Sequence, residues 1–200
     1  MPALNRAHRS CRALREVPSA HVVDPPIVAW LGQRRVMAGR RDTMHQELHD
    51  LFVQDQAGRQ GGMRPGVAEC DRQRRRRLTE LLAAGALQEA TDYWHAAMLL
   101  QHGDTLDDYW QAHDLAKRGA TLGHAGCRWL AAAAYDRWLV SQGKPQRFGT
   151  QSRTVDGRLA LYPVDPTTTD AERAEWLVKP LADLRPSEPS NLLPGDTSKR

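Results

Sequence analysis

Helix-length segments with an apolar stripe, most of them followed by glycine, are the feature that most constrains the fold of this chain. Leu48, Leu51 and Phe52 recur at the spacing of one helix face, which predicts a helix over about 44–57. Four more helices are predicted, over about 67–84, 89–101, 106–122 and 125–142. Three of these are ended by Gly85, Gly103 and Gly123. Glycine is favoured just past the end of a helix, so the pattern predicts an all-α fold.

Polar residues at the expected helix starts refine this prediction. Thr105 is placed to cap the fourth helix, and Asp107 and Asp108 then lie in its first turn, near the free N–H groups. Thr169 or Asp170 is expected to cap a short sixth helix, with Glu172 completing a capping box. We therefore predict five to six helices in an irregular bundle.

The region after Gly149 changes character. Two β-type segments flank Asp156 and Gly157, which is a turn signal, so one small β-hairpin is expected near 150–162. The stretch from Tyr109 to Leu139 resembles one tetratricopeptide-like helical hairpin. No second copy follows at a fixed period, so a repeat array is not predicted.

Charge divides the chain into unequal parts. The formal net charge is +4, and residues 1–43 hold eight arginines against three acidic residues. The excess positive charge therefore belongs to the first 43 residues, which lack a sustained apolar period and are predicted to be a disordered basic extension. Translation starting at Met37 or Met44 is the alternative explanation of this segment. The folded helical domain is predicted over 44–185, and 186–200, rich in Pro and Ser, is predicted to be a disordered tail.

The composition also excludes some classes of protein. No run approaches the roughly 20 apolar residues that cross a bilayer, so we expect no membrane association. The three cysteines, Cys11, Cys70 and Cys127, are far apart and lack metal-binding spacing, which favours a reducing cytoplasmic location. No sequence motif for a cofactor is present, and we predict none.

Two polar motifs resemble a known family. The segment Gln101-His102-Gly103-Asp104 and the loop Pro145–Gln151 are similar to the two marker motifs of a bacterial family of helical proteins of unknown function. The resemblance covers about 45–185 and implies no activity, but it implies that the N-terminal extension is atypical. Lys179 departs from the pattern, because a proline is expected at that position.

The end of the third helix carries the candidate catalytic residues. His102 is a possible general base, and Asp104 would orient its ring and raise its basicity. The structural alternative is a histidine at a helix C-terminus, beside a turn aspartate. A metal site of His102, Asp104 and His113 would need a recognisable ligand spacing that the sequence lacks, so no metal is predicted. His95, seven residues before His102, shares its helix face.

A second set of polar residues lies in and near the loop 143–151. Asp136 and Arg137 are expected to anchor this loop, Asp136 through backbone amides and Arg137 through backbone carbonyls. Neutral amides either recognise polar ligands or satisfy buried backbone groups. The predicted ligand-binding residues are Gln101, His95, Arg137, Gln146, Thr150 and Gln151.

These residues lead to two main functional hypotheses. The first is a binding module for a protein or a small polar ligand, which uses a groove between 101–104 and 144–151. The second is a hydrolase or lyase in which His102 and Asp104 form the acid/base pair. Nucleic-acid binding through residues 1–43 and the arginines at 74–77 is a third and less favoured hypothesis, because the arginine run is predicted to be a solvated helix face opposite a leucine stripe.

Overall fold

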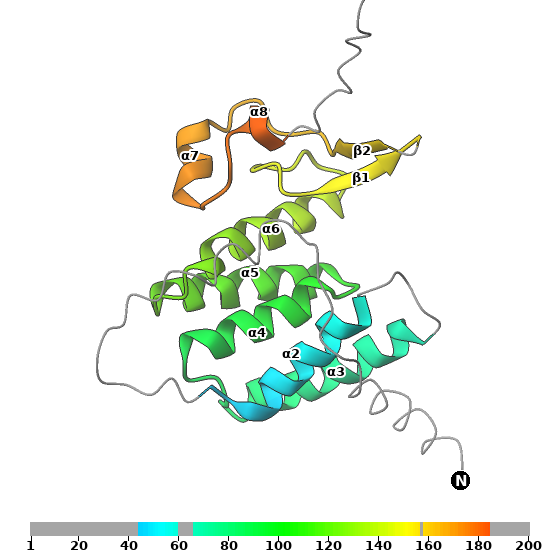
Figure 1. Cartoon of the computed structure of the whole chain (residues 1–200), viewed down its shortest axis with the longest axis vertical. Coiled ribbons are helices and arrows are strands. Elements are labelled where there is room, and N and C mark those ends of the chain that lie inside the picture. The colour runs from blue at the N-terminus through cyan, green and yellow to red at the C-terminus, as the bar shows by residue number, and fades with distance from the viewer. Residues whose placement is uncertain (1–43, 60–65, 157, 185–200) are drawn as a thin grey trace, which may run out of the picture.

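The computed structural model describes residues 44–59, 66–156 and 158–184, and within them the fold is helical with one small sheet (Figure 1). The helices are α2 (Gln46–Arg59), α3 (Val67–Ala83), α4 (Ala90–Gln101), α5 (Leu106–Thr121), α6 (Gly126–Val140), α7 (Asp170–Glu175) and α8 (Leu181–Leu184). The predicted all-α class with a β-hairpin is confirmed, and the bounds of the five long helices agree with the prediction to within two residues. The single turn α8 was not predicted.

Two predictions concern residues outside the described part of the chain. These are the disordered basic extension over 1–43, including the start at Met37, and the disordered tail over 186–200. The first described residue is Met44 and the last is Leu184.

The helices form a succession of layers (Figure 1). Helix α4 packs against both α2 and α3 on one side and against α5 and α6 on the other. The hairpin, α7 and α8 lie beyond α6, at the end of the molecule opposite α2 and α3. The C-terminal end of α4 is therefore within reach of side chains from several elements.

Small residues allow the central helices to approach closely. Ala131, Ala132, Ala133 and Ala134 of α6 are fully buried. A Cβ atom added at Gly119 of α5 would lie 2.5 Å from the Sγ atom of Cys127 in α6. Because the backbones pack so tightly, the polar side chains at the helix ends are held in defined positions.

The predicted helix starts are confirmed in detail. The Thr105 side chain accepts from the backbone N–H of Asp108, and the Asp108 carboxylate accepts from the backbone N–H of Thr105, both at 3.1 Å. Thr169 and Glu172 form the same reciprocal pair at the start of α7. Short-range sequence patterns therefore determine where these two helices begin.

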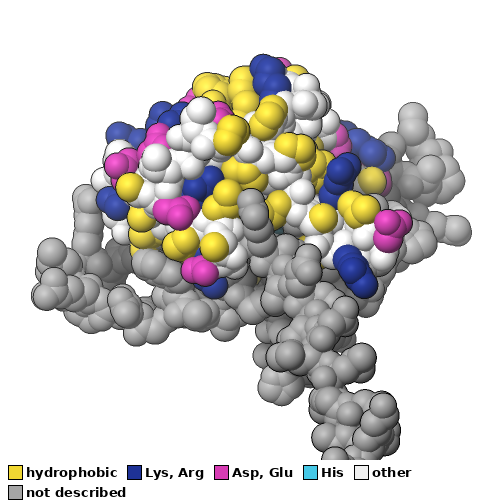
Figure 2. Space-filling model, turned by 90° about the horizontal axis from the view of Figure 1, so that it is seen from above, with side chains coloured by type: hydrophobic (Ala, Val, Ile, Leu, Met, Phe, Trp, Pro, Cys, Tyr) yellow, Lys and Arg dark blue, Asp and Glu magenta, His cyan; other side chains and the backbone are white. Residues whose placement is uncertain are grey.

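The strands β1 (Ser152–Val155) and β2 (Arg158–Leu161) pair antiparallel, with Ser152 opposite Leu161. Figure 2 views the face formed by the hairpin, α7 and α8, and it shows hydrophobic side chains spread across that face. The large hydrophobic side chains that are exposed in these parts of the chain are Val155, Leu159 and Leu177. None of the described helices is both long enough and apolar enough to span a bilayer.

Candidate functional site

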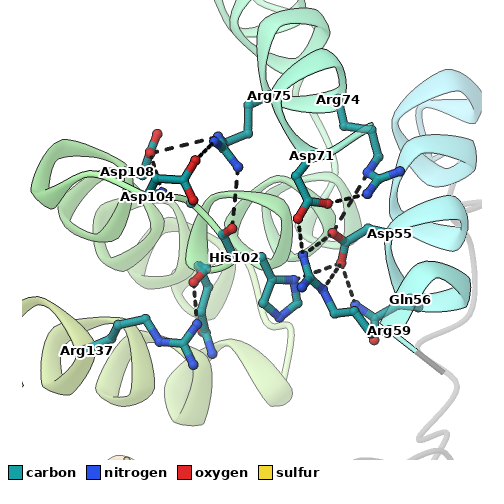
Figure 3. Close-up of polar contacts among 12 residues, drawn as sticks. Asp55, Gln56, Arg59, Asp71, Arg74, Arg75, His102, Asp104, Asp108 and Arg137 are labelled. Atoms are coloured by element: carbon teal, nitrogen blue, oxygen red, sulfur yellow. Dashed lines mark hydrogen bonds and ion pairs between the residues drawn. The ribbon is translucent and has the colours of Figure 1, made fainter. Parts of the chain in front are cut away.

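His102 caps the C-terminus of α4, and its closest side-chain partner comes from α2 (Figure 3). The Nδ1 atom of His102 lies 2.8 Å from Oδ2 of Asp55. An ionised carboxylate only accepts hydrogen bonds, so Nδ1 carries the proton and donates it. In the neutral ring this leaves a lone pair on Nε2. Within the described part of the chain, Nε2 makes no hydrogen bond.

Burial and charge set the protonation states of this pair. Burial opposes ionisation of Asp55, but hydrogen bonds from His102 and Arg59 outweigh it and lower the pKa of Asp55 to about 2. Burial lowers the pKa of His102, although the Asp55 carboxylate acts in the opposite direction. Near neutral pH, Asp55 is therefore charged and His102 is neutral.

Asp104 does not contact His102, in contrast to the orienting role assigned to it from the sequence. Its side chain is 68% exposed and forms an ion pair with Arg75 of α3. Arg75 also donates to the backbone oxygen of His102, at 3.4 Å. The turn at Gly103 carries Asp104 towards α3, and the packing of α2 on α4 supplies Asp55 instead. The residue that orients His102 therefore lies 47 positions earlier in the chain.

Asp55 belongs to a buried network that joins α2 to α3 (Figure 3). Arg59 donates to both of its oxygens, at 2.7 Å and 3.1 Å, and also lies 3.3 Å from Asp71. Arg74 forms an ion pair with Asp71, and its Nε atom lies 3.9 Å from Asp55. Two carboxylates thus face two guanidinium groups, which compensates the buried charge.

The prediction that the whole arginine run is solvated is wrong for Arg74. The run was expected to form a solvated face, but Arg74 is only 5% exposed. It lies on the same helix face as Leu78 and Leu81, which are buried. Arg72 and Arg77 are exposed, as expected, so only part of the run faces solvent.

The loop after α6 is organised by Asp136. This fully buried carboxylate accepts from the backbone N–H groups of Arg147, Phe148 and Thr150, at 2.7 to 3.0 Å, and from the Thr150 hydroxyl at 2.8 Å. The predicted anchoring of the loop through backbone amides is confirmed. Asp136 therefore has a structural explanation that requires no ligand.

The neutral polar residues of the loop are also used within the protein. The Gln146 amide donates to the backbone oxygens of Gln151 and Tyr162, and its oxygen accepts from the Gln151 backbone, all at 2.8 or 2.9 Å. The Gln151 amide donates to the Ala133 oxygen, and Thr150 donates to Asp136. Gln146, Thr150 and Gln151 thus fasten the loop to α6 and to the hairpin.

Arg137 connects this loop to the end of α4. Its Nη1 donates to the backbone oxygen of Gln101 at 2.6 Å, and its Nε donates to Oε1 of Gln151 at 3.1 Å. The predicted contact with loop carbonyls is therefore replaced by one carbonyl of α4 and one side-chain amide. Gln101 of α4 and Gln151 of the loop therefore both contact this guanidinium. Arg137 is half-buried.

The two remaining predicted residues of α4 differ in their surroundings. Gln101 is 6% exposed, and no described residue donates to its Oε1 atom. His95 is 3% exposed and stacks on Phe52, with ring centroids 4.5 Å apart. Its Nε2 lies 3.4 Å from Nδ1 of His49. His95 therefore packs with the rings of α2, whereas Gln101 lies beside Arg137 and His102.

The residues considered for a metal do not converge. Nδ1 of His113 donates to the Ala131 oxygen at 2.9 Å, between α5 and α6, while Asp104 pairs with Arg75. Among the described residues, no group of three or more His, Cys, Asp or Glu side chains is arranged to hold a metal ion.

Two hollows of the surface lie elsewhere. One, on α5, is lined by Trp110 and neighbouring acidic residues, and the other lies at the turn between α5 and α6. Neither includes His102 or Arg137.

Comparison with known proteins finds no similar protein. No family model matches the chain, no curated protein matches it, and no solved structure matches it. A functional assignment therefore depends on the chemistry of the site.

Proposed function

We propose that this domain binds a small polar ligand at the C-terminal end of α4. The observation that supports the proposal is that polar side-chain atoms at the end of α4 lack hydrogen-bond partners, whereas those of the loop have them. Gln146, Thr150 and Gln151 direct their polar atoms to partners within the protein. At the end of α4, by contrast, Oε1 of Gln101 and Nε2 of His102 have no hydrogen-bond partner among the described residues.

The free energy of such groups supports a binding role. The large majority of buried polar side-chain atoms in folded proteins are hydrogen-bonded. Leaving a buried acceptor without a donor costs on the order of 1–3 kcal/mol. A ligand that donates to Gln101 would recover this free energy on binding. Local departures from good packing and pairing are concentrated at functional sites, which is why we place the ligand here.

A binding experiment with matched glutamine variants tests the proposal. A panel of charged and uncharged small polar compounds is titrated against the wild type by thermal shift and calorimetry. A compound that binds should lose at least about tenfold in affinity in Gln101→Leu, equivalent to about 1.4 kcal/mol. Gln111→Leu, which changes an exposed amide of α5, should retain the affinity. If no compound of any class binds, or if Gln101→Leu binds as the wild type does, the proposal is wrong.

The contact between His102 and Asp55 favours a second candidate, a hydrolase or lyase. A buried carboxylate that holds Nδ1–H leaves Nε2 as a base, and this arrangement is common in general acid–base catalysis. Asp55 takes the orienting role first given to Asp104. Turnover of a compound from a panel of hydrolase and lyase substrates by the wild type, lost in His102→Ala while the thermal stability is retained, would support this candidate. Loss of stability alone would contradict it.

A further inference from the structure

We infer that the ligand of this site carries an oxyanionic group, a carboxylate or a phosphate, which Arg137 binds beside His102 while a donor elsewhere in the ligand reaches Gln101. The inference rests on the proposed function and names the chemical class of its ligand. It comes from the charge balance of the interior, from the hydrogen bonds that hold the Arg137 guanidinium, and from the position of the His102 ring.

The charge balance singles out Arg137. Four arginines of the described residues are buried or half-buried: Arg74, Arg75, Arg137 and Arg173. Three of them form ion pairs with carboxylates, namely Arg74 with Asp71, Arg75 with Asp104, and Arg173 with Asp170. No carboxylate of the described residues lies within ion-pairing distance of Arg137. Because burial of an unpaired charge is unfavourable, an anion is the group that this position lacks.

The guanidinium is also held in a fixed orientation. Nη1 is bound to the Gln101 oxygen and Nε to the Gln151 side chain. The third nitrogen, Nη2, makes no hydrogen bond to a described residue, and it is not among the fully buried atoms. Guanidinium groups bind carboxylates and phosphates through directed N–H donors, and a donor that is already oriented loses less entropy on binding.

His102 is adjacent to this donor. Arg137 binds the carbonyl oxygen of Gln101, the residue directly before His102, and Figure 3 shows its guanidinium beside the end of α4 that carries the His102 ring. The charges around His102 are Asp55 and Arg59 from α2 and Arg137 from α6, and Arg75 of α3 contacts its backbone oxygen. The two guanidinium groups of Arg59 and Arg137 disfavour the charged ring, which Asp55 favours.

An oxyanion at Arg137 changes this balance. Its negative charge offsets the guanidinium and stabilises the protonated form of His102, whose Nε2 then donates to the bound oxygen. Binding is therefore coupled to proton uptake by His102. The affinity should increase as the pH falls towards the ordinary pKa of histidine, about 6.5.

The test uses sulfate and acetate as probes, since neither ion titrates near neutral pH. Each is added at constant ionic strength, with chloride as the balancing anion, and the ring resonance of His102 is followed by NMR. The His102→Gln spectrum assigns that resonance. We expect a saturable shift with millimolar affinity, and an affinity at least about threefold higher near pH 6 than near pH 7.5. A stronger response to sulfate would indicate a phosphate group, and a stronger response to acetate a carboxylate.

Two conservative variants of α6 provide the comparison. Arg137→Lys keeps the charge but removes the planar set of N–H donors of the guanidinium. We expect the affinity for the anion to fall at least about fivefold. Arg128→Lys changes an exposed arginine of the same helix and should bind as the wild type does. If Arg137→Lys fails to fold, the pH dependence of binding by the wild type, compared by calorimetry with that of His102→Gln, decides the question. An affinity without pH dependence in the wild type then overturns the inference.

The failure of this inference differs from failure of the proposed function. Suppose that binding of an uncharged compound depends on Gln101, while sulfate and acetate do not shift the His102 ring resonance. The inference of an oxyanionic ligand is then wrong, but the proposed binding site is supported. Equal affinities in Arg137→Lys and Arg128→Lys overturn the role of Arg137. If no compound in the panel binds, the proposed function itself is wrong.

Discussion

The Nδ1 atom of His102 and the Oδ2 atom of Asp55 lie 2.8 Å apart, although 47 positions separate the two residues. This contact joins the C-terminal end of α4 to α2, and Arg59, Asp71 and Arg74 extend it to α3. A single carboxylate thus contributes both to the folded structure and to the protonation state of the candidate base.

Asp55→Asn should therefore destabilise the protein strongly. It removes the carboxylate that accepts from both Arg59 and His102, and it leaves Asp71 as the carboxylate partner of Arg59 among the described residues. We expect the free energy of unfolding to fall by about 2–3 kcal/mol, measured by urea denaturation. Asp114→Asn, at an exposed position of α5, should change it by less than about 0.5 kcal/mol. Similar losses in the two variants would contradict the buried network.

The free energy of unfolding should depend on pH through the ionisation of Asp55. The pKa of Asp55 is about 2 in the folded protein and 3.8 when unperturbed, so its ionised form stabilises the fold. This contribution is complete above about pH 4, is lost as the pH falls towards 2, and amounts to about 2 kcal/mol. The lowered pKa of His102 acts in the same direction, as the pH falls below about 6.5. Urea unfolding between about pH 7 and pH 2 measures the effect, and the loss between about pH 4 and pH 2 should be smaller in Asp55→Asn.

The identity of the residue that orients His102 is testable by NMR. Asp55 raises the pKa of His102, so Asp55→Asn should lower that pKa further. Asp104→Asn should leave it nearly unchanged, because Asp104 pairs with Arg75. A titration of the His102 ring resonance in both variants gives the answer. A larger effect of Asp104→Asn would restore the pairing that the sequence suggested.

Asp136→Asn should loosen the loop after α6. An asparagine places an N–H donor against the backbone N–H groups that the carboxylate now accepts from. We expect a loss of about 2–4 kcal/mol in the free energy of unfolding. The amides of Arg147, Phe148 and Thr150 should lose protection from hydrogen exchange, while those of α4 keep it. Unchanged protection in the loop would show that Asp136 does not hold it.

Two glycines with positive φ provide a matched pair. Gly149 has φ of +92°, and an added Cβ would lie 3.1 Å from Cδ1 of Leu184. Gly143 has φ of +71°, with nothing within 4 Å of an added Cβ. Both alanine variants should lose about 1 kcal/mol because of the left-handed backbone. Gly149→Ala should lose more, because Leu184 must also move. Thermal denaturation measures the difference, and equal losses would contradict the tight packing at Gly149.

Local chemistry made the helices predictable from the sequence. The apolar stripe that contains Leu48, the capping pair of Thr105 and Asp108, and the stop at Gly85 each act within a few residues of the chain. The anchoring role of Asp136 was also predictable, because the loop that it binds begins only a few residues later.

The site depended on contacts that no local pattern records. Asp55 contacts His102 because α2 packs on α4. Arg137 lies beside Gln101 because α6 also packs on α4. The choice of helical segments and their ends could be read from the amino-acid sequence alone, since these preferences arise from neighbouring residues. The partner of His102, Asp55 in place of Asp104, and the lack of a described carboxylate near Arg137 follow from how the helices pack, because packing sets the distances between side chains that are far apart in the sequence.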